Sequence, residues 1–305
     1  MRVKGFLFLI VLVVVLLFTA CQNTVEQGIA ADERMVVFVS VVPQQYFVDR
    51  IGGKFVDVRV MVEAGESPAT YEPKPSQMAA LNEAKIYYSI GVPFETVWLE
   101  KITSMNKSMV IVDTASGIER MPIMDEHSNE NDEKETDHKE GALDPHIWLS
   151  PSLVKIQARH IFSALVDADP EHAKEYEINL NAFLADIEHL EENLNLTLSD
   201  LETRKFMVFH PSWGYFAREF DLEQIAIEVG GTEPSAEEMV ELIEKAQEED
   251  IHVIFAQPEF SQQDAETIAN AIDGEVVLIS PLAYDWLENL REVAATFSAA
   301  MGAEK

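Results

Sequence analysis

The chain has few basic residues and almost no cysteine. Its 305 residues include 22 Lys and Arg against 54 Asp and Glu, which gives a formal net charge of −32. This charge argues against nucleic acid as a partner, because so few basic side chains could not offset the phosphates. The single cysteine, Cys21, cannot form a disulfide within the chain. No G-x-G-x-x-G or H-E-x-x-H motif occurs, so nucleotide binding and zincin-type proteolysis have no support.

An apolar run lies at the N-terminus, from Gly5 to Ala20, directly after Arg2 and Lys4. It is shorter than the roughly 20 residues that a membrane span needs. A basic start, a short apolar run and small residues where the apolar run ends predict a secretory signal over residues 1–20. The following "LLFTAC" resembles a lipoprotein signal, in which the cysteine becomes the lipidated first residue. We therefore expect an extracytoplasmic protein, periplasmic or at the cell surface, anchored at Cys21 and tethered through residues 21–33.

Two series of short Val-, Ile- and Phe-rich runs follow, and most gaps between them are long enough for a helix. Strands that alternate with helices indicate parallel sheets covered on both faces. The sequence thus predicts an α/β fold with two lobes, each around a four-stranded, mainly parallel sheet. The expected strands are Met35–Val42, Val56–Glu63, Lys85–Gly91 and Ser108–Asp113 in the first lobe, and Lys205–Phe209, Leu222–Glu228, Ile251–Ala256 and Glu275–Ile279 in the second.

Between the two series lies an amphipathic pattern with apolar residues spaced alternately three and four apart. Its members are Ala173, Tyr176, Leu180, Phe183, Ile187, Leu190 and Leu194. Asp169-Pro170 is a plausible helix start, and a helix over residues 169–202 would be roughly 50 Å long. The pattern has too few heptads for a coiled-coil dimer, so we expect a monomer with a rigid helix joining lobes 34–168 and 203–305.

Residues 121–142 differ from the rest of the first lobe. They are rich in acidic residues, include His127 and His138, and show no apolar periodicity. Such a composition predicts a mobile surface loop.

Several polar side chains come soon after predicted strands or at the edge of the acidic loop. They are His146, His210, Glu259 and Asp285. In open parallel sheets, ligands bind beyond the carboxyl ends of the strands. Two imidazoles and one carboxylate form a set of ligands that Zn²⁺ accepts. Spacing alone does not decide between this role and ordinary packing, because such ligands make no short motif.

Six segments together resemble the zinc/manganese-binding receptors of ABC metal-uptake transporters: "SPATYEPKPSQ", "DPHIWLSP", "FHPSWGYFAREF", "GTEPSAEEM", "VIFAQPEFS" and "PLAYDWLENL". The resemblance covers essentially the whole chain from about residue 36. It implies two Rossmann-like lobes joined by one long helix, with the metal between them, and delivery of that metal to an ABC permease. Carried over residue by residue, it places the ligands at His146, His210 and Asp285.

The resemblance favours zinc over manganese. Manganese-type members commonly have Glu in the place of His210, and imidazole suits Zn²⁺ better than Mn²⁺. One departure concerns Ala69, which stands where the family has its first histidine ligand. The coordination position that this histidine would occupy on the metal is then open to water, to a loop histidine such as His127 or His138, or to a carboxylate. Glu72 keeps its family place and is an auxiliary candidate.

Two alternatives remain at this point. A site with two histidines, a carboxylate and an open position is also how catalytic zinc sites are built. No general base is evident beside it, so we expect no enzyme. The other alternative is a receptor-like lipoprotein in which Ala69 has changed the specificity toward another metal or a metal chelate, or one that acts as an adhesin.

Overall fold

The computed structural model describes residues 34–123, 143–228, 232–260 and 262–302. The fold described here is that of the compact unit Met35–Lys305. The predicted signal, Cys21 and the histidines at 127 and 138 lie outside the described residues. Among the described residues, no helix is both long and apolar enough to cross a membrane.

The first sheet forms the N-terminal lobe, and its four strands are all parallel, in the order β2-β1-β3-β4. The central strands are buried on both faces, which is why they read as continuous apolar runs. Its strands are β1 (Met35–Val41), β2 (Val56–Val62), β3 (Ile86–Ser89) and β4 (Val110–Asp113). Its helices are α2 (Val42–Gly52), α3 (Pro75–Ala80), α4 (Pro93–Met105) and α5 (Pro151–Ala168).

The second sheet forms the C-terminal lobe and repeats this plan, with parallel strands in the order β6-β5-β7-β8. Its strands are β5 (Lys205–Val208), β6 (Glu223–Ala226), β7 (Val253–Ala256) and β8 (Glu275–Leu278). Its helices are α7 (Gly214–Glu219), α8 (Ala236–Glu248), α9 (Gln263–Ala271) and α10 (Trp286–Met301). The predicted α/β fold with two four-stranded parallel sheets is confirmed, and each strand lies within its predicted range or matches it at one end.

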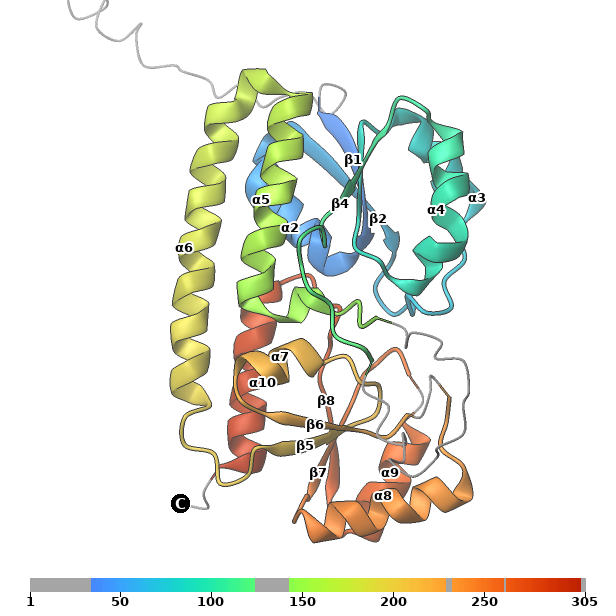
Figure 1. Ribbon diagram of the computed structural model, residues 1–305, viewed down its shortest axis with the longest axis vertical. Helices are drawn as coiled ribbons and strands as arrows, with labels where there is room; N and C mark the ends of the chain where they lie inside the picture. Colours follow the sequence, from blue (N-terminus) through green and yellow to red (C-terminus); the bar gives the residue numbers. More distant parts are fainter. Residues whose placement is uncertain (1–33, 124–142, 229–231, 261, 303–305) are drawn as a thin grey trace, which may run out of the picture. The chain divides into compact units, whose positions relative to one another are not determined.

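A single long helix, α6 (Ala173–Thr197), runs along both lobes from the end of α5 toward β5 (Figure 1). It is shorter than the predicted helix: at 1.5 Å per residue its 25 residues span about 38 Å. It also ends at Thr197, before the predicted end, while at its start the reason lies at Asp169, whose carboxylate accepts hydrogen bonds from His172 and Tyr176, both at 2.7 Å. These bonds hold residues Pro170–His172 in a 3₁₀ turn, so the α-helix starts only at Ala173.

The hydrophobic core runs through both lobes beside α6 and α10. Trp286, at the start of α10, packs its ring against Phe47 of α2 and Phe183 of α6. Its indole N–H donates to the carbonyl of Trp148, while the Trp148 indole donates to the carbonyl of Pro281, both at 2.7 Å. The two lobes are therefore joined by buried aromatic packing as well as by the linker helix.

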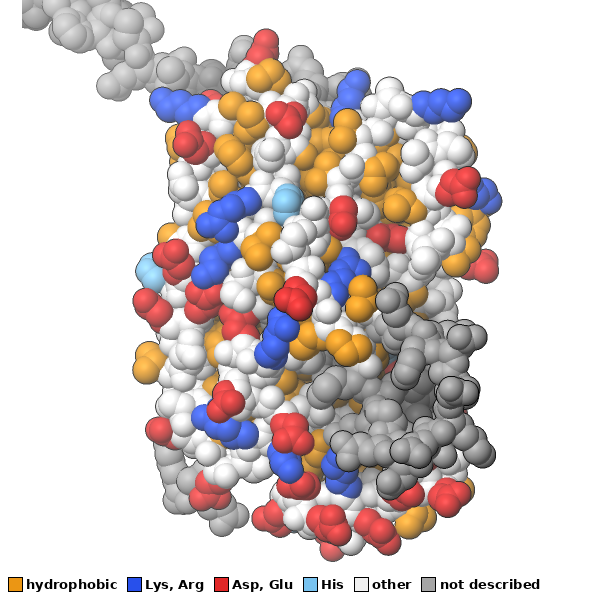
Figure 2. All heavy atoms as spheres, in the orientation of Figure 1, with side chains coloured by type: hydrophobic (Ala, Val, Ile, Leu, Met, Phe, Trp, Pro, Cys, Tyr) orange, Lys and Arg blue, Asp and Glu red, His pale blue; other side chains and the backbone are white. Residues whose placement is uncertain are grey.

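The acidic excess of the sequence is visible on the surface. Figure 2 shows carboxylates gathered at the end of the C-terminal lobe formed by α8, where exposed glutamates include Glu237, Glu241, Glu244 and Glu248. Ser235 caps the N-terminus of helix α8: its hydroxyl accepts from the Glu238 backbone N–H, while the Glu238 side chain accepts from the Ser235 backbone N–H. These reciprocal bonds form a capping box, and the acidic first turn of α8 is favourable at a helix N-terminus.

Candidate metal site

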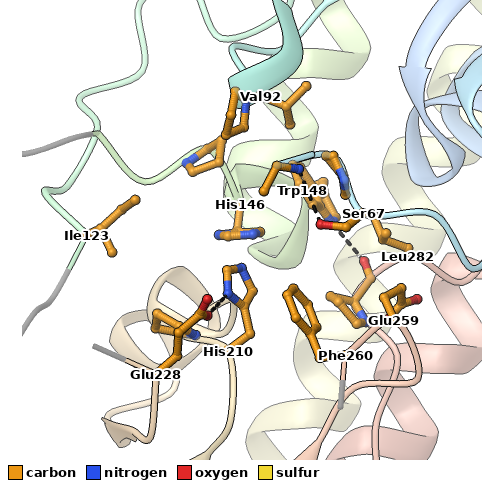
Figure 3. Close-up of a pocket in the computed structure, with 16 residues that line it drawn as sticks. Ser67, Val92, Ile123, His146, Trp148, His210, Glu228, Glu259, Phe260 and Leu282 are labelled. Atoms are coloured by element: carbon orange, nitrogen blue, oxygen red, sulfur yellow. Dashed lines mark hydrogen bonds and ion pairs between the residues drawn. The ribbon is translucent and has the colours of Figure 1, made fainter. Parts of the chain in front are cut away.

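A cavity of about 280 Å³ opens where the carboxyl ends of the strands of both sheets meet (Figure 3). Its wall comes from the segments that follow seven of the eight strands. These segments contribute Ser67, Pro68 and Ala69 after β2, Val92 and Pro93 after β3, Ile123, Pro145, His146 and Trp148 after β4, His210 and Pro211 after β5, Glu228 after β6, Glu259 and Phe260 after β7, and Pro281 and Leu282 after β8. This is the position at which open parallel sheets bind ligands.

The cavity brings two of the predicted residues together. The ring centroids of His146 and His210 lie 5.2 Å apart, and the two side chains are only 12% and 20% exposed. Figure 3 shows the two rings next to each other, His146 from the N-terminal lobe and His210 from the C-terminal lobe. Two imidazoles on one tetrahedral Zn²⁺, at Zn–N distances of about 2.0–2.1 Å, would have centroids roughly 5 Å apart. The observed separation fits a shared ion.

His146 is fixed by the buried carboxylate of Asp144. One oxygen of Asp144 accepts from both the backbone N–H of His146, at 2.9 Å, and its ring Nδ1, at 2.7 Å. Directly after His146 the chain enters a buried 3₁₀ turn, Ile147–Leu149, that leads to α5. The position of the imidazole is therefore fixed by hydrogen bonds to its backbone and its ring, and by the packed segment that follows.

His210 is fixed in a similar way by residues that follow neighbouring strands. Its Nδ1 bonds the carboxylate of Glu228, and its ring stacks on Phe260 with centroids 4.6 Å apart. The buried amide of Gln257 binds the His210 backbone twice, accepting from its N–H at 3.1 Å and donating to its carbonyl at 2.7 Å. Both the backbone and the ring are thus oriented before any ligand arrives.

The carboxylate partners determine which ring nitrogen is available. An ionised carboxylate only accepts hydrogen bonds, so Nδ1 of each imidazole carries the hydrogen and Nε2 keeps its lone pair. Burial lowers the pKa of His210 below its ordinary 6.5, although the bond to Glu228 opposes this shift. The arrangement carboxylate–imidazole–open Nε2 is how proteins orient histidine ligands toward a metal.

The third predicted ligand does not join the pair. The side chain of Asp285 caps α10 by accepting from the backbone N–H of Glu288, and the residue is exposed and does not line the cavity. It lies seven residues beyond the end of β8, and the residues of that turn that reach the cavity are Pro281 and Leu282. Glu72 is likewise exposed and outside the wall, whereas Ala69 lines it.

The described part of the chain contains no group of three His, Cys, Asp or Glu side chains placed to hold a metal as they stand. Of the three predicted ligands, the two that converge are therefore the imidazoles of His146 and His210. Three residues that support them were not predicted from the sequence: Asp144, Glu228 and Gln257. A signal for two of them exists, because Glu228 and Gln257 come within two residues of the ends of β6 and β7, as His210 does after β5.

Replacing Glu228 with Gln tests the orientation of His210. The glutamine amide can accept a hydrogen bond from Nδ1 through its oxygen or donate one to Nδ1 through its nitrogen. It therefore no longer fixes the tautomer that leaves the Nε2 lone pair free. We expect about a 10- to 100-fold loss of zinc affinity, the effect typical of a lost outer carboxylate. Zinc titration against a chromophoric chelator measures this. Glu223→Gln, at the exposed start of β6, is the matched control, and equal affinities in both variants would refute the role of Glu228.

A two-lobed α/β protein with paired ligands at the facing strand ends is the architecture of a solute-binding receptor. The chain belongs to the family described as zinc-uptake complex component A, periplasmic, whose model matches residues 37–300. This is a transport family and not an enzyme family. The predicted resemblance is thereby confirmed.

Individual relatives agree with the family. The high-affinity zinc uptake system protein ZnuA of Bacillus subtilis (strain 168) is 28% identical over 276 residues, with 88% of this chain and 85% of the relative covered. The zinc-binding protein AdcA of Streptococcus pyogenes serotype M3 is 26% identical and covers 90% of this chain, but the chain spans only 55% of AdcA. Both names describe proteins that handle zinc.

Solved structures support the fold. A crystal structure of ZnuA superposes with a TM-score of 0.80 at 46% identity, covering 88% of this chain and 99% of that one. A zinc-bound deletion mutant of ZnuA gives a TM-score of 0.81 at 45% identity, with 89% and 100% covered. The laminin-binding protein of Streptococcus agalactiae, at 23% identity and a TM-score of 0.76, shares the fold.

Proposed function

We propose that this protein captures Zn²⁺ outside the cytoplasmic membrane and hands it to an ABC permease for uptake. The observation that carries the proposal is the His146–His210 pair, with both Nδ1 atoms bound to carboxylates and both rings in one mainly apolar cavity. Imidazole nitrogen suits Zn²⁺ better than the harder Mn²⁺, which prefers carboxylate oxygen. The zinc-handling relatives support the same choice of metal.

In this proposal the bound ion joins the lobes. His146 belongs to the N-terminal lobe and His210 to the C-terminal lobe, so an ion held by both adds a link across the cavity. Release to a permease then requires these two bonds to be broken by ligand exchange. The acidic surface concentrates cations around the protein and raises the rate at which they reach the cavity.

The location completes the proposal. Export through the signal at residues 1–20 and lipidation at Cys21 would hold a monomeric receptor at the membrane beside its permease. His127 and His138, which lie outside the described residues, are proposed as auxiliary groups that gather metal. Labelling of cells with radioactive palmitate tests the anchor, and the Cys21→Ser variant is expected to lose the label.

Metal analysis of the purified protein tests the function. After dialysis against micromolar Zn²⁺ and Mn²⁺ together, we expect close to one equivalent of zinc and little manganese. Cells that lack the gene are expected to take up less ⁶⁵Zn at low external zinc, and the wild-type gene restores uptake. A protein that retains no zinc from this mixture contradicts the proposal.

Zinc capture should weaken in acid, because coordinating imidazoles must be neutral. The lowered pKa of His210 keeps that ring neutral to a lower pH than an ordinary histidine. We therefore expect the zinc affinity to fall with decreasing pH, with the contribution of His210 appearing at a lower pH than an ordinary histidine would give. Titrations at buffered free Zn²⁺ from pH 8 to 4.5 measure the profile. Undiminished binding well below pH 5 would count against imidazole ligation.

A further inference from the structure

The cavity is much larger than a zinc ion and the waters that complete its shell require. Zn²⁺ on two protein nitrogens needs two further donors, and two waters occupy on the order of 60 Å³. The cavity holds about 280 Å³. An apolar cavity of roughly 150 Å³ is already large enough to bind benzene. Space for a small organic molecule therefore remains beside the two imidazoles.

The wall of this space is suited to an organic group and poorly suited to water. Five of its residues are proline, which has no backbone N–H, and Trp148, Phe260, Val92 and Leu282 add apolar surface. Ala69 presents only a methyl group where the family resemblance implies an imidazole ligand. The wall thus lacks a third imidazole and offers apolar surface instead. An organic ligand could pack on this surface and supply the missing donor atom to the metal.

One polar group in the wall lacks a partner. The Oε2 atom of Glu259 is buried and has no hydrogen-bond partner among the described residues. A buried carboxylate oxygen without a partner is costly, and it is an acceptor for an N–H group in the cavity. Figure 3 shows Glu259 on the Phe260 side of the cavity, away from the Glu228 carboxylate that holds His210.

We propose that the site takes its divalent metal together with a small organic chelating ligand, one that supplies the missing donors to the metal and an N–H group to Glu259. An α-amino acid with a nitrogen side chain has this chemistry. Its amine, carboxylate or ring nitrogen can bind Zn²⁺, and a metal-bound amine keeps N–H hydrogens to donate. The inference rests on the proposed function, since His146 and His210 still anchor the ion.

Zinc binding at buffered free Zn²⁺, with and without L-histidine as the probe, tests this inference. At fixed free Zn²⁺, simple competition by L-histidine leaves the occupancy of the protein unchanged, whereas a ternary complex raises it. We expect L-histidine to increase the apparent zinc affinity at least tenfold, and native mass spectrometry to show the mass of protein plus zinc plus one histidine. Occupancy independent of L-histidine, with only the zinc adduct in the spectrum, overturns the inference.

Two variants sharpen the test. Ala69→His supplies the third imidazole from the chain, so it should bind zinc more tightly without L-histidine and gain little from adding it. Glu259→Gln should lose most of the gain given by L-histidine but retain the gain given by 1-methylimidazole, which can bind zinc but has no N–H to donate. An L-histidine gain in Glu259→Gln equal to that of the wild type overturns the assignment of Glu259.

X-ray absorption at the zinc edge distinguishes failure of the chelating-ligand inference from failure of the proposed zinc capture. We expect two imidazoles on zinc in the wild-type protein alone and three with L-histidine. Three or more without the probe would overturn the inference and leave the proposed function standing. Absence of bound zinc under both conditions would instead refute the proposed function.

Discussion

Replacing His210 with alanine is expected to lower the zinc affinity by at least about 100-fold. The ring supplies one of two converging nitrogens, and loss of a metal ligand costs more than the 10- to 100-fold typical of an outer partner. His146→Ala should have an effect of the same size, because the two rings are held symmetrically by Asp144 and Glu228. Competition titration against a chromophoric chelator measures both.

The control for these variants is His252→Ala. His252 has a 65% exposed side chain paired with Asp250 and does not line the cavity. Its removal should leave the zinc affinity unchanged within twofold. If His252→Ala and His210→Ala lose zinc equally, the metal is held somewhere other than the cavity. If the double variant His146→Ala/His210→Ala still binds one equivalent tightly, the assigned ligands are wrong.

Trp286→Ala is expected to cost about 3–5 kcal/mol of unfolding free energy, the range for removing a buried aromatic ring. The ring is 1% exposed, packs on Phe47 with centroids 5.2 Å apart, and donates to the carbonyl of Trp148. Its removal leaves a cavity where both lobes meet and deprives a buried carbonyl of its donor. For a protein of this size we expect the melting temperature to fall by roughly 5–9 °C.

Two comparisons make this prediction specific. Val97→Ala, at a residue 75% exposed on α4, should change the unfolding free energy by less than about 0.5 kcal/mol. Trp286→Phe keeps an aromatic ring but loses the N–H and part of the indole, so its cost should lie between the two. A loss below about 1 kcal/mol in Trp286→Ala, measured by denaturant unfolding, would show that this contact does not join the lobes as described.

Asp285 illustrates how one position in the chain fits two structural roles. It follows β8 and precedes a helix, which in a parallel α/β fold is where ligands are found. The same position is also that of a helix N-cap, and the carboxylate accepts the backbone N–H of Glu288 instead of facing the cavity. Sequence spacing does not distinguish the two roles, because they require the same residue type at the same place.

The sequence by itself determined the secondary structure and the class of protein. Apolar runs of the length of β1 or β5, and the three–four spacing along α6, are local patterns that burial imposes directly on residue type. The segments around His146 and His210 likewise indicated the family and predicted one ligand in each lobe. Local chemistry was sufficient for these conclusions.

Only the tertiary structure decided what surrounds the two imidazoles. Asp144 and Glu228 accept hydrogen bonds from the two Nδ1 atoms, and Gln257 bonds to the His210 backbone. Ala69 and Glu259 line the same cavity. Apart from the Asp144 bond, each of these contacts joins segments that are far apart in the chain. Parallel strands joined by helices bring such segments to one sheet edge, but the direction of each side chain there is set by packing between elements. A carboxylate that ends up capping a helix or orienting an imidazole is therefore assigned by the fold and not by its neighbours in sequence.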